Sequence, residues 1–157
     1  MKKILNPWVG EPTYHCYGCC PDSHNGLRME FYEDGDDIVS HWTPREEFQG
    51  WRDTLHGGIQ ATLADEIASW VVFRKFQTSG VTSKLEARYL KPILISDGEI
   101  TLRASVVCTK RNLIEIAVRI FDHFGEEAAR VNCLYFLFPQ AKAHDEFGFR
   151  EFKVEGE

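Results

Sequence analysis

Asp65 stands within a mostly apolar run of helical spacing, TLHGGIQATLADEIASWVVF, from residue 54 to residue 73. Aspartate is a poor residue for a helix interior, and burying its carboxylate without a partner costs free energy. At about 100° per residue, a core stripe falls on the side away from Asp65; its members are Ile59, Leu63, Ile67 and Trp70. The residues around Asp65 are nearly all small, namely Gly58, Ala61, Thr62, Ala68 and Ser69. This pattern predicts a groove with a reactive carboxylate on its floor.

Two glycines, Gly57 and Gly58, follow His56 at the start of this helix. The first N–H groups of a helix have no intrahelical partner, and the helix dipole favours negative charge there. The N–H of Gly57 is therefore a candidate donor to a carbonyl oxygen, an interaction that contributes a few kcal/mol in a transition state. Attack on such a carbonyl group needs this donor together with a general base or a carboxylate nucleophile. Asp65 and the helix start supply both.

The surrounding pattern predicts the elements that position these groups. Residues 26–44 form two strand-like runs around the turn EDGDD, which indicates a hairpin. The helix is expected to end near QTSG, with Gly80 as the stop signal. Residues 81–90 alternate strictly, and three further strand runs between 99 and 138 continue a meander of four strands. One sheet and one apolar helix pack best as an α+β fold in which the sheet wraps around the helix.

Composition limits the class of protein. With 157 residues, 43% of them hydrophobic, the chain supports one core, so we predict a single domain over residues 1–157. Within it we distinguish an N-terminal extension at 1–25, which carries a cysteine cluster, and a charged tail at 140–157 that packs or frays. The uncovered edges and flank of a half-wrapped sheet predict self-association.

The charge balance and the cysteine content indicate which classes of partner and which cellular compartment to expect. The excess of 24 acidic over 18 basic residues argues against a nucleic-acid partner. No run is long and apolar enough for a membrane span, and Pro7 interrupts the start before a secretory segment develops. Five cysteines form no disulfide framework. These features predict a cytoplasmic protein without a membrane partner.

The segment CYGCC contains Cys16 and Cys19 at C-x-x-C spacing, with His15, Cys20 and His24 nearby. A structural zinc site draws four ligands, normally from two such pairs, and no second pair is present. Redox chemistry of the thioredoxin type is also disfavoured because the cluster has no βαβ setting. The preferred interpretation is a turn with buried thiols that leads into the first strand, without a metal.

The segment HGGIQATLADE, with the acid nine positions after the histidine, resembles the signature of hotdog-fold acyl-CoA thioesterases, in the phenylacetate-degradation branch. FQGWRDTLHGG and CYGCCPDSHNGLRMEFY also resemble members of that branch, so the similarity runs from residue 16 to residue 138. The resemblance implies a hotdog fold, an antiparallel β-sheet wrapped around one long central helix. It further implies a homodimer or homotetramer with the active site at the dimer interface, and hydrolysis of acyl-CoA to free acid and CoA with no separate cofactor.

The same resemblance implies roles for individual residues. Asp65 matches the general base or nucleophile, and Gly57 matches the N–H that binds the carbonyl oxygen. His56 is expected to shape the helix entry and to help position the substrate, and Thr82 to orient the attacking water. Residues expected to contact the substrate are Gly58, Gln49 and Ser69.

Two alternatives stay open at this point. Asp65 can be a structural carboxylate that is satisfied by a serine or threonine across an interface. The chain can also be a hotdog module that binds acyl-CoA, or another acyl ligand, without turnover. Glu66 points about 100° away from Asp65, and we expect it to be solvated or paired at an interface.

Overall fold

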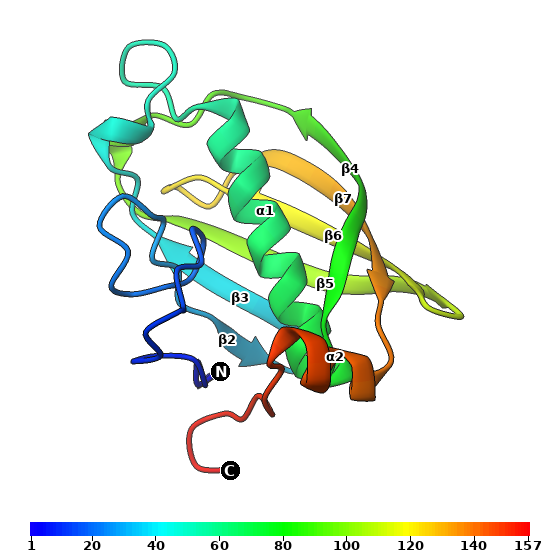
Figure 1. Cartoon of the computed structure of the whole chain (residues 1–157). Coiled ribbons are helices and arrows are strands. Elements are labelled where there is room, and N and C mark those ends of the chain that lie inside the picture. The colour runs from blue at the N-terminus through cyan, green and yellow to red at the C-terminus, as the bar shows by residue number, and fades with distance from the viewer.

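The computed structural model describes residues 1–157 and packs one long helix against one antiparallel sheet (Figure 1). Helix α1 (Gly57–Val71) continues into a π-helical segment, η2 (Val72–Phe76), and a short helix α2 (Gln140–Phe147) follows the last strand. The seven strands are β1 (Lys2–Lys3), β2 (Tyr32–Asp34), β3 (Asp37–Trp42), β4 (Gly80–Tyr89), β5 (Ile100–Lys110), β6 (Leu113–Phe121) and β7 (Glu127–Leu137). Two 3-10 turns are η1 (Glu46–Phe48) and η3 (Ile95–Asp97). The predicted architecture, an antiparallel sheet around one long helix, is confirmed.

The order of strands in the sheet is β1-β2-β3-β5-β6-β7-β4. The expected hairpin is β2 and β3, although pairing begins only at Tyr32. The predicted four-strand meander is wrong: β5, β6 and β7 form it, while β4 pairs with β7 at the far edge and β5 pairs with β3. Alternation of side chains specifies which face of a strand is buried but not which strand lies beside it.

The helix ends at the QTSG segment, as predicted, but Gly80 is not the residue that stops it. Gln77 ends it in the left-handed conformation, with φ of 49°, and its side-chain amide donates to the Phe152 carbonyl at 2.9 Å. Gly80 is instead the first residue of β4, where an added Cβ would lie 2.5 Å from the Phe136 carbonyl oxygen in β7. This glycine therefore permits close approach of two strands, and Gln77 holds the turn by its own side-chain hydrogen bond.

The core lies between α1 and the inner face of the sheet. On the helix, Leu63, Ile67 and Trp70 are buried as predicted, while Ile59 is only partly buried. The sheet contributes alternate residues of three strands, which are Ile100, Leu102, Ala104, Ile114, Ile116, Val118, Ile120, Val131, Cys133 and Tyr135. The buried side chains, which recur at every second residue of the strands, pack against the apolar stripe of the helix in one continuous layer.

The C-terminal tail packs into this core and does not fray. Phe152 is fully buried, and its ring centroid lies 5.0 Å from that of Phe73 and 5.1 Å from that of Trp70. Beyond it, Val154 forms a bridge with Ile4, so the two ends of the chain meet. The aromatic residues of the tail thus close the end of the core beside η2.

Replacing Phe152 with alanine is expected to lower the free energy of unfolding by about 3–5 kcal/mol, because a buried ring is lost and a cavity remains. The measurement is denaturant unfolding at one fixed protein concentration. The matched control is Phe147→Ala, since this ring is 52% exposed and stacks on Phe138 near the surface; we expect a loss below about 1 kcal/mol. Equal losses for the two variants would contradict a core role for the tail.

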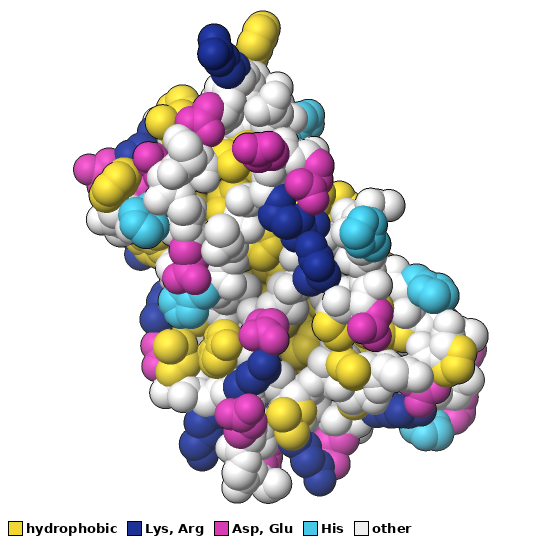
Figure 2. Space-filling view, turned by 90° about the vertical axis from the view of Figure 1, so that its left-hand side faces the viewer, with side chains coloured by type: hydrophobic (Ala, Val, Ile, Leu, Met, Phe, Trp, Pro, Cys, Tyr) yellow, Lys and Arg dark blue, Asp and Glu magenta, His cyan; other side chains and the backbone are white.

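No helix of the structure combines the length and the apolarity needed to cross a membrane. On the face seen in Figure 2, acidic and basic side chains are interspersed with hydrophobic ones. Neither sign of charge gathers into a single patch on this face. An anionic ligand bound there would therefore meet local cations and not a broad positive field.

Candidate active site

Asp65 lies near the middle of α1, on the side that faces β4 and β7, and is partly buried. Its Oδ1 accepts hydrogen bonds from the hydroxyl of Thr82 at 2.6 Å and from that of Tyr135 at 2.7 Å. Thr82 and Tyr135 are direct partners across β4 and β7, so their side chains share one face of the sheet. Oδ2 has no hydrogen-bond partner in the chain. The two strands hold one carboxylate oxygen of Asp65 and leave the other without a partner in the chain.

A β-bulge in β4 places Thr82. Thr82 lies opposite Tyr135 and Lys84 lies opposite Leu134, so Ser83 is an extra residue in this strand. In a regular strand, Thr82 and Lys84 would point to the same face. The extra residue lets Thr82 turn toward the helix while the side chain of Lys84 stays 69% exposed. Bulges commonly re-aim a side chain in this way.

Tyr135 is a site residue that the sequence analysis missed. Its hydroxyl carries one proton and lies 2.7 Å from both Oδ1 and the backbone carbonyl oxygen of Asp65. Burial, with the Asp65 charge adding to it, raises the pKa of Tyr135 well above its ordinary value. The same two causes raise the pKa of the neighbouring Cys133 thiol to about 12. Neutral hydroxyl and thiol groups therefore surround the carboxylate, and the partners of Oδ1 are not cations.

The helix start has the geometry that the HGG segment predicts. His56 is the N-cap residue, and its Nδ1 accepts a hydrogen bond from the Gly58 N–H at 2.9 Å. A Cβ on Gly58 would lie 3.0 Å from that nitrogen, so the cap favours glycine there. The Gly57 N–H has no hydrogen-bond partner in the chain, and the Gly57 carbonyl accepts from the Tyr89 hydroxyl at 2.5 Å. The unpaired Gly57 N–H is the expected donor for an incoming oxygen.

Gly57 and Asp65 of one chain are too far apart to act on one carbonyl group. They are separated by eight residues of continuous helix, which at about 1.5 Å per residue is about 12 Å. A nucleophile or base and an oxyanion donor must both lie about 3 Å from the reacting group. One chain therefore does not bring these two groups to the same carbonyl group.

Comparison with known proteins agrees with this architecture. The model of the thioesterase superfamily matches residues 53–129, from the loop before α1 to the beginning of β7. A thioesterase superfamily protein of known structure superposes with a TM-score of 0.69 at 22% identity, over 77% of this chain and 62% of that chain. A hypothetical thioesterase from Streptococcus pneumoniae, solved with coenzyme A, gives 0.65 at 23% identity, over 71% and 87%. The chain has a hotdog fold.

A curated relative of this hotdog chain is an uncharacterized protein of Schizosaccharomyces pombe, 32% identical over 97 residues. The match takes in 59% of the present chain and 55% of the yeast protein, so it spans little more than half of that relative. The solved structures, at these identities, establish the fold alone.

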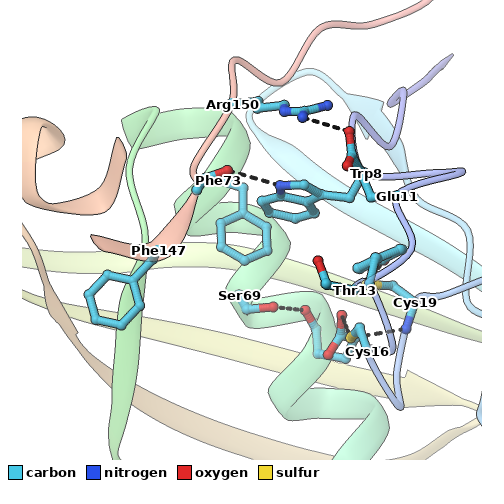
Figure 3. A pocket seen from close by; sticks show the side chains of 12 residues that line it. Trp8, Glu11, Thr13, Cys16, Cys19, Ser69, Phe73, Phe147 and Arg150 are labelled. Atoms are coloured by element: carbon cyan, nitrogen blue, oxygen red, sulfur yellow. Dashed lines mark hydrogen bonds and ion pairs between the residues drawn. The ribbon is translucent and has the colours of Figure 1, made fainter. Parts of the chain in front are cut away.

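The side chains of two predicted substrate residues of the hotdog chain make no hydrogen bond to the Asp65 carboxylate. Ser69 donates to the Glu66 backbone carbonyl at 2.7 Å and lines a cavity of about 440 Å³ between α1 and the two terminal segments (Figure 3). Gln49 is exposed and borders a separate hollow beside Asp53. Asp65 lines none of the five main cavities of the isolated chain. In the isolated chain, therefore, none of these five cavities surrounds the Asp65 carboxylate.

Of the two expectations for Glu66, solvated or paired at an interface, the structure contradicts the first. The Trp70 indole N–H donates to Glu66 Oε1 at 3.2 Å, and the Cys16 thiol donates to the same oxygen at 3.4 Å. Burial raises the pKa of this carboxyl. A Cβ on Gly18 would overlap the Glu66 carboxyl, so the glycine lets the N-terminal segment cover it. Helical periodicity gave the direction of Glu66 but not the segment that packs over it.

Proposed function

We propose that this chain hydrolyses acyl-CoA thioesters to a free acid and CoA. The observation that carries the proposal is a carboxylate, Asp65, with one oxygen anchored and one free, on a helix whose first N–H, that of Gly57, is unpaired. The match to the thioesterase superfamily supports the reaction class, and the S. pneumoniae neighbour with coenzyme A supports the substrate class. Acceptance of a CoA thioester, and not another acyl carrier, is part of the proposal.

The reaction follows from these two groups. Asp65 Oδ2 takes a proton from a water molecule while the water oxygen attacks the thioester carbonyl carbon. The carbonyl oxygen gains negative charge, which the Gly57 N–H stabilises. The C–S bond then breaks, and the leaving sulfur receives the proton that Asp65 holds. If Asp65 acts as the nucleophile, Oδ2 attacks the carbonyl carbon, the C–S bond breaks and CoA leaves as a thiolate; water then hydrolyses the resulting anhydride to the free acid and the Asp65 carboxylate. In both cases the hydroxyls of Thr82 and Tyr135 fix Oδ1 and thereby aim Oδ2.

The separation of Gly57 from Asp65 supports a site shared by two chains. When two copies associate about a twofold axis with their helices antiparallel, the start of one helix lies beside the middle of the other. The exposed flank next to α1 is suited to such contact, because β4 is an edge strand and Val81 and Tyr89 on it are 50% and 48% exposed. The proposed unit is a homodimer, which can pair again as a homotetramer.

A hybrid dimer tests the shared site. One chain carries Asp65→Asn and the other carries Gly57→Pro, so each homodimer lacks one essential group in both sites. In the hybrid, one of the two sites receives the intact Gly57 and the intact Asp65, so the isolated hybrid should have about half of wild-type activity and a randomly mixed population about a quarter. Coexpression with two different affinity tags isolates the hybrid. A hybrid as inactive as its parents, although dimeric, would show that each site belongs to one chain.

Substrate class is tested with a panel of aromatic and aliphatic acyl-CoAs. Similarity to the phenylacetate-degradation branch leads us to propose that aromatic acyl groups are among the substrates. Released CoA should be measured by chromatography, because the exposed Cys108 thiol would react with thiol reagents. Acyl-CoA binding in calorimetry without release of CoA would identify a binding module in place of an enzyme.

A further inference from the structure

Three metal-ligating groups converge where the N-terminal segment crosses α1. The Cys16 and Cys19 thiols and the Glu66 carboxylate place their ligand atoms within 4.8 Å of one another. Cys16 Sγ lies 3.4 Å from Glu66 Oε1. In Figure 3, Cys16 and Cys19 lie beside the helix that carries Ser69, at one end of the cavity. This cluster takes no part in the proposed hydrolysis.

We propose that Cys16, Cys19 and Glu66 bind a zinc ion. Zinc prefers sulfur and carboxylate donors in a tetrahedral arrangement, in which neighbouring donor atoms are about 3.5 Å apart. The distance between Cys16 Sγ and Glu66 Oε1 fits this spacing without movement. Three protein ligands leave a fourth position for water, and all three ligands line the 440 Å³ cavity, which gives that position access to solvent.

The surroundings of the cluster are those of a metal site. Cys16 Sγ accepts a hydrogen bond from the Cys19 N–H at 3.4 Å, which favours the thiolate that a metal needs. The Tyr14 hydroxyl lies 2.8 Å from Cys19 Sγ, and the Trp70 indole holds Glu66 Oε1. Such outer contacts orient the ligands of a metal ion.

The charge balance also favours a cation. A carboxylate and two thiols face one another here, and the only basic residue lining the cavity, Arg150, pairs with Glu11 at 2.6 Å. A buried carboxylate without a basic partner is costly when ionised. One divalent ion offsets two of the three negative charges that the two thiolates and Glu66 carry when all three bind it. The sequence predicted no metal because it shows one C-x-x-C pair; the third donor comes from a helix residue about 50 positions away.

The test is metal binding by the full-length protein, without any acyl-CoA. After removal of metal with a chelator under reducing conditions, the protein should take up one zinc per chain, measured by mass spectrometry of the elements. Cobalt in the same site should give a thiolate-to-metal charge-transfer band and the visible bands of tetrahedral Co²⁺. Zinc should also raise the melting temperature.

Variants locate the ligands. Cys16→Ser and Cys19→Ser should each weaken zinc affinity at least about 100-fold, and Glu66→Gln about 10- to 100-fold. The matched control is Cys20→Ser, in the same loop: the thiol of Cys20 donates to the Tyr14 carbonyl and not to the cluster, so this variant should leave affinity unchanged. Circular dichroism verifies that each variant is folded.

Several results would overturn the proposal. One is a reduced, folded wild type that takes up no zinc and shows no charge-transfer band with cobalt. Another is retention of full affinity by Cys16→Ser or by Glu66→Gln. A third is formation of a disulfide between Cys16 and Cys19 in air, together with no metal uptake by the reduced protein; the pair would then be a redox element. None of these results bears on hydrolysis at Asp65.

Discussion

Asp65→Asn is expected to lower kcat for acyl-CoA hydrolysis by about 10²- to 10⁴-fold, the usual contribution of a general base. Asparagine keeps the size of the side chain, and its carbonyl oxygen can still accept from the Thr82 and Tyr135 hydroxyls that hold Oδ1. What disappears is the ability to take a proton or to attack a carbonyl carbon. Fold and acyl-CoA affinity should therefore persist, so the loss falls on kcat.

The measurement is CoA release under saturating substrate, combined with acyl-CoA affinity by calorimetry. Asp36→Asn serves as the matched control, because Asp36 is exposed in the turn between β2 and β3. That variant should hydrolyse at the wild-type rate. If Asp65→Asn also kept the wild-type rate, the carboxylate would be a structural group, satisfied by its two hydroxyl partners.

Gly57→Pro should lower kcat by about 10²- to 10³-fold, the loss typical of one oxyanion donor. Gly57 is the first residue of α1, a position where proline suits a helix because the N–H has no intrahelical partner. His56, with ψ of 131°, already has the extended conformation that a residue before proline adopts. The substitution therefore removes the proposed donor and leaves the helix in place.

Gly57→Ala is the control that isolates the N–H group. In either variant the added Cβ approaches the Tyr89 ring at about 3.3 Å, but alanine keeps the donor. We expect Gly57→Ala to retain most of the activity, and the ratio of the two kcat values measures the contribution of the hydrogen bond. Equal losses in both variants would assign the effect to crowding against Tyr89.

Periodicity in the sequence predicted the helix, its core stripe and most of the strand residues. Those predictions hold because burial of one face repeats every 3.6 or every 2 residues, whatever the neighbours are. The position of β4 beside β7, and the role of Gln77 in place of Gly80 as the residue that ends the helix, were not predictable in this way. Both depend on contacts with residues far along the chain, Phe136 and Phe152 among them.

The candidate site was predictable in part. Asp65, the HGG entry and Thr82 came from motif and resemblance, and the structure brings Thr82 to Asp65. Tyr135 was missed, although alternation along β7 places it on the buried face, where a hydroxyl needs a partner. The expectation of a solvated Glu66 was wrong, because a helical wheel gives the direction of a side chain and cannot show that the N-terminal segment covers it.

The direction in which the Thr82 side chain points depends on the number of residues in β4, because the strand contains one extra residue. Deleting Ser83 would restore the regular alternation of side chains in β4. The residues of β4 before this position would then point to the opposite face of the sheet. In a homologous chain with the same threonine but without the extra residue, the threonine hydroxyl would point into water. The aspartate carboxylate would then keep only one hydrogen-bond donor, the tyrosine hydroxyl. Insertions and deletions, and not only substitutions, can therefore separate reactive from inert members among proteins of this shape.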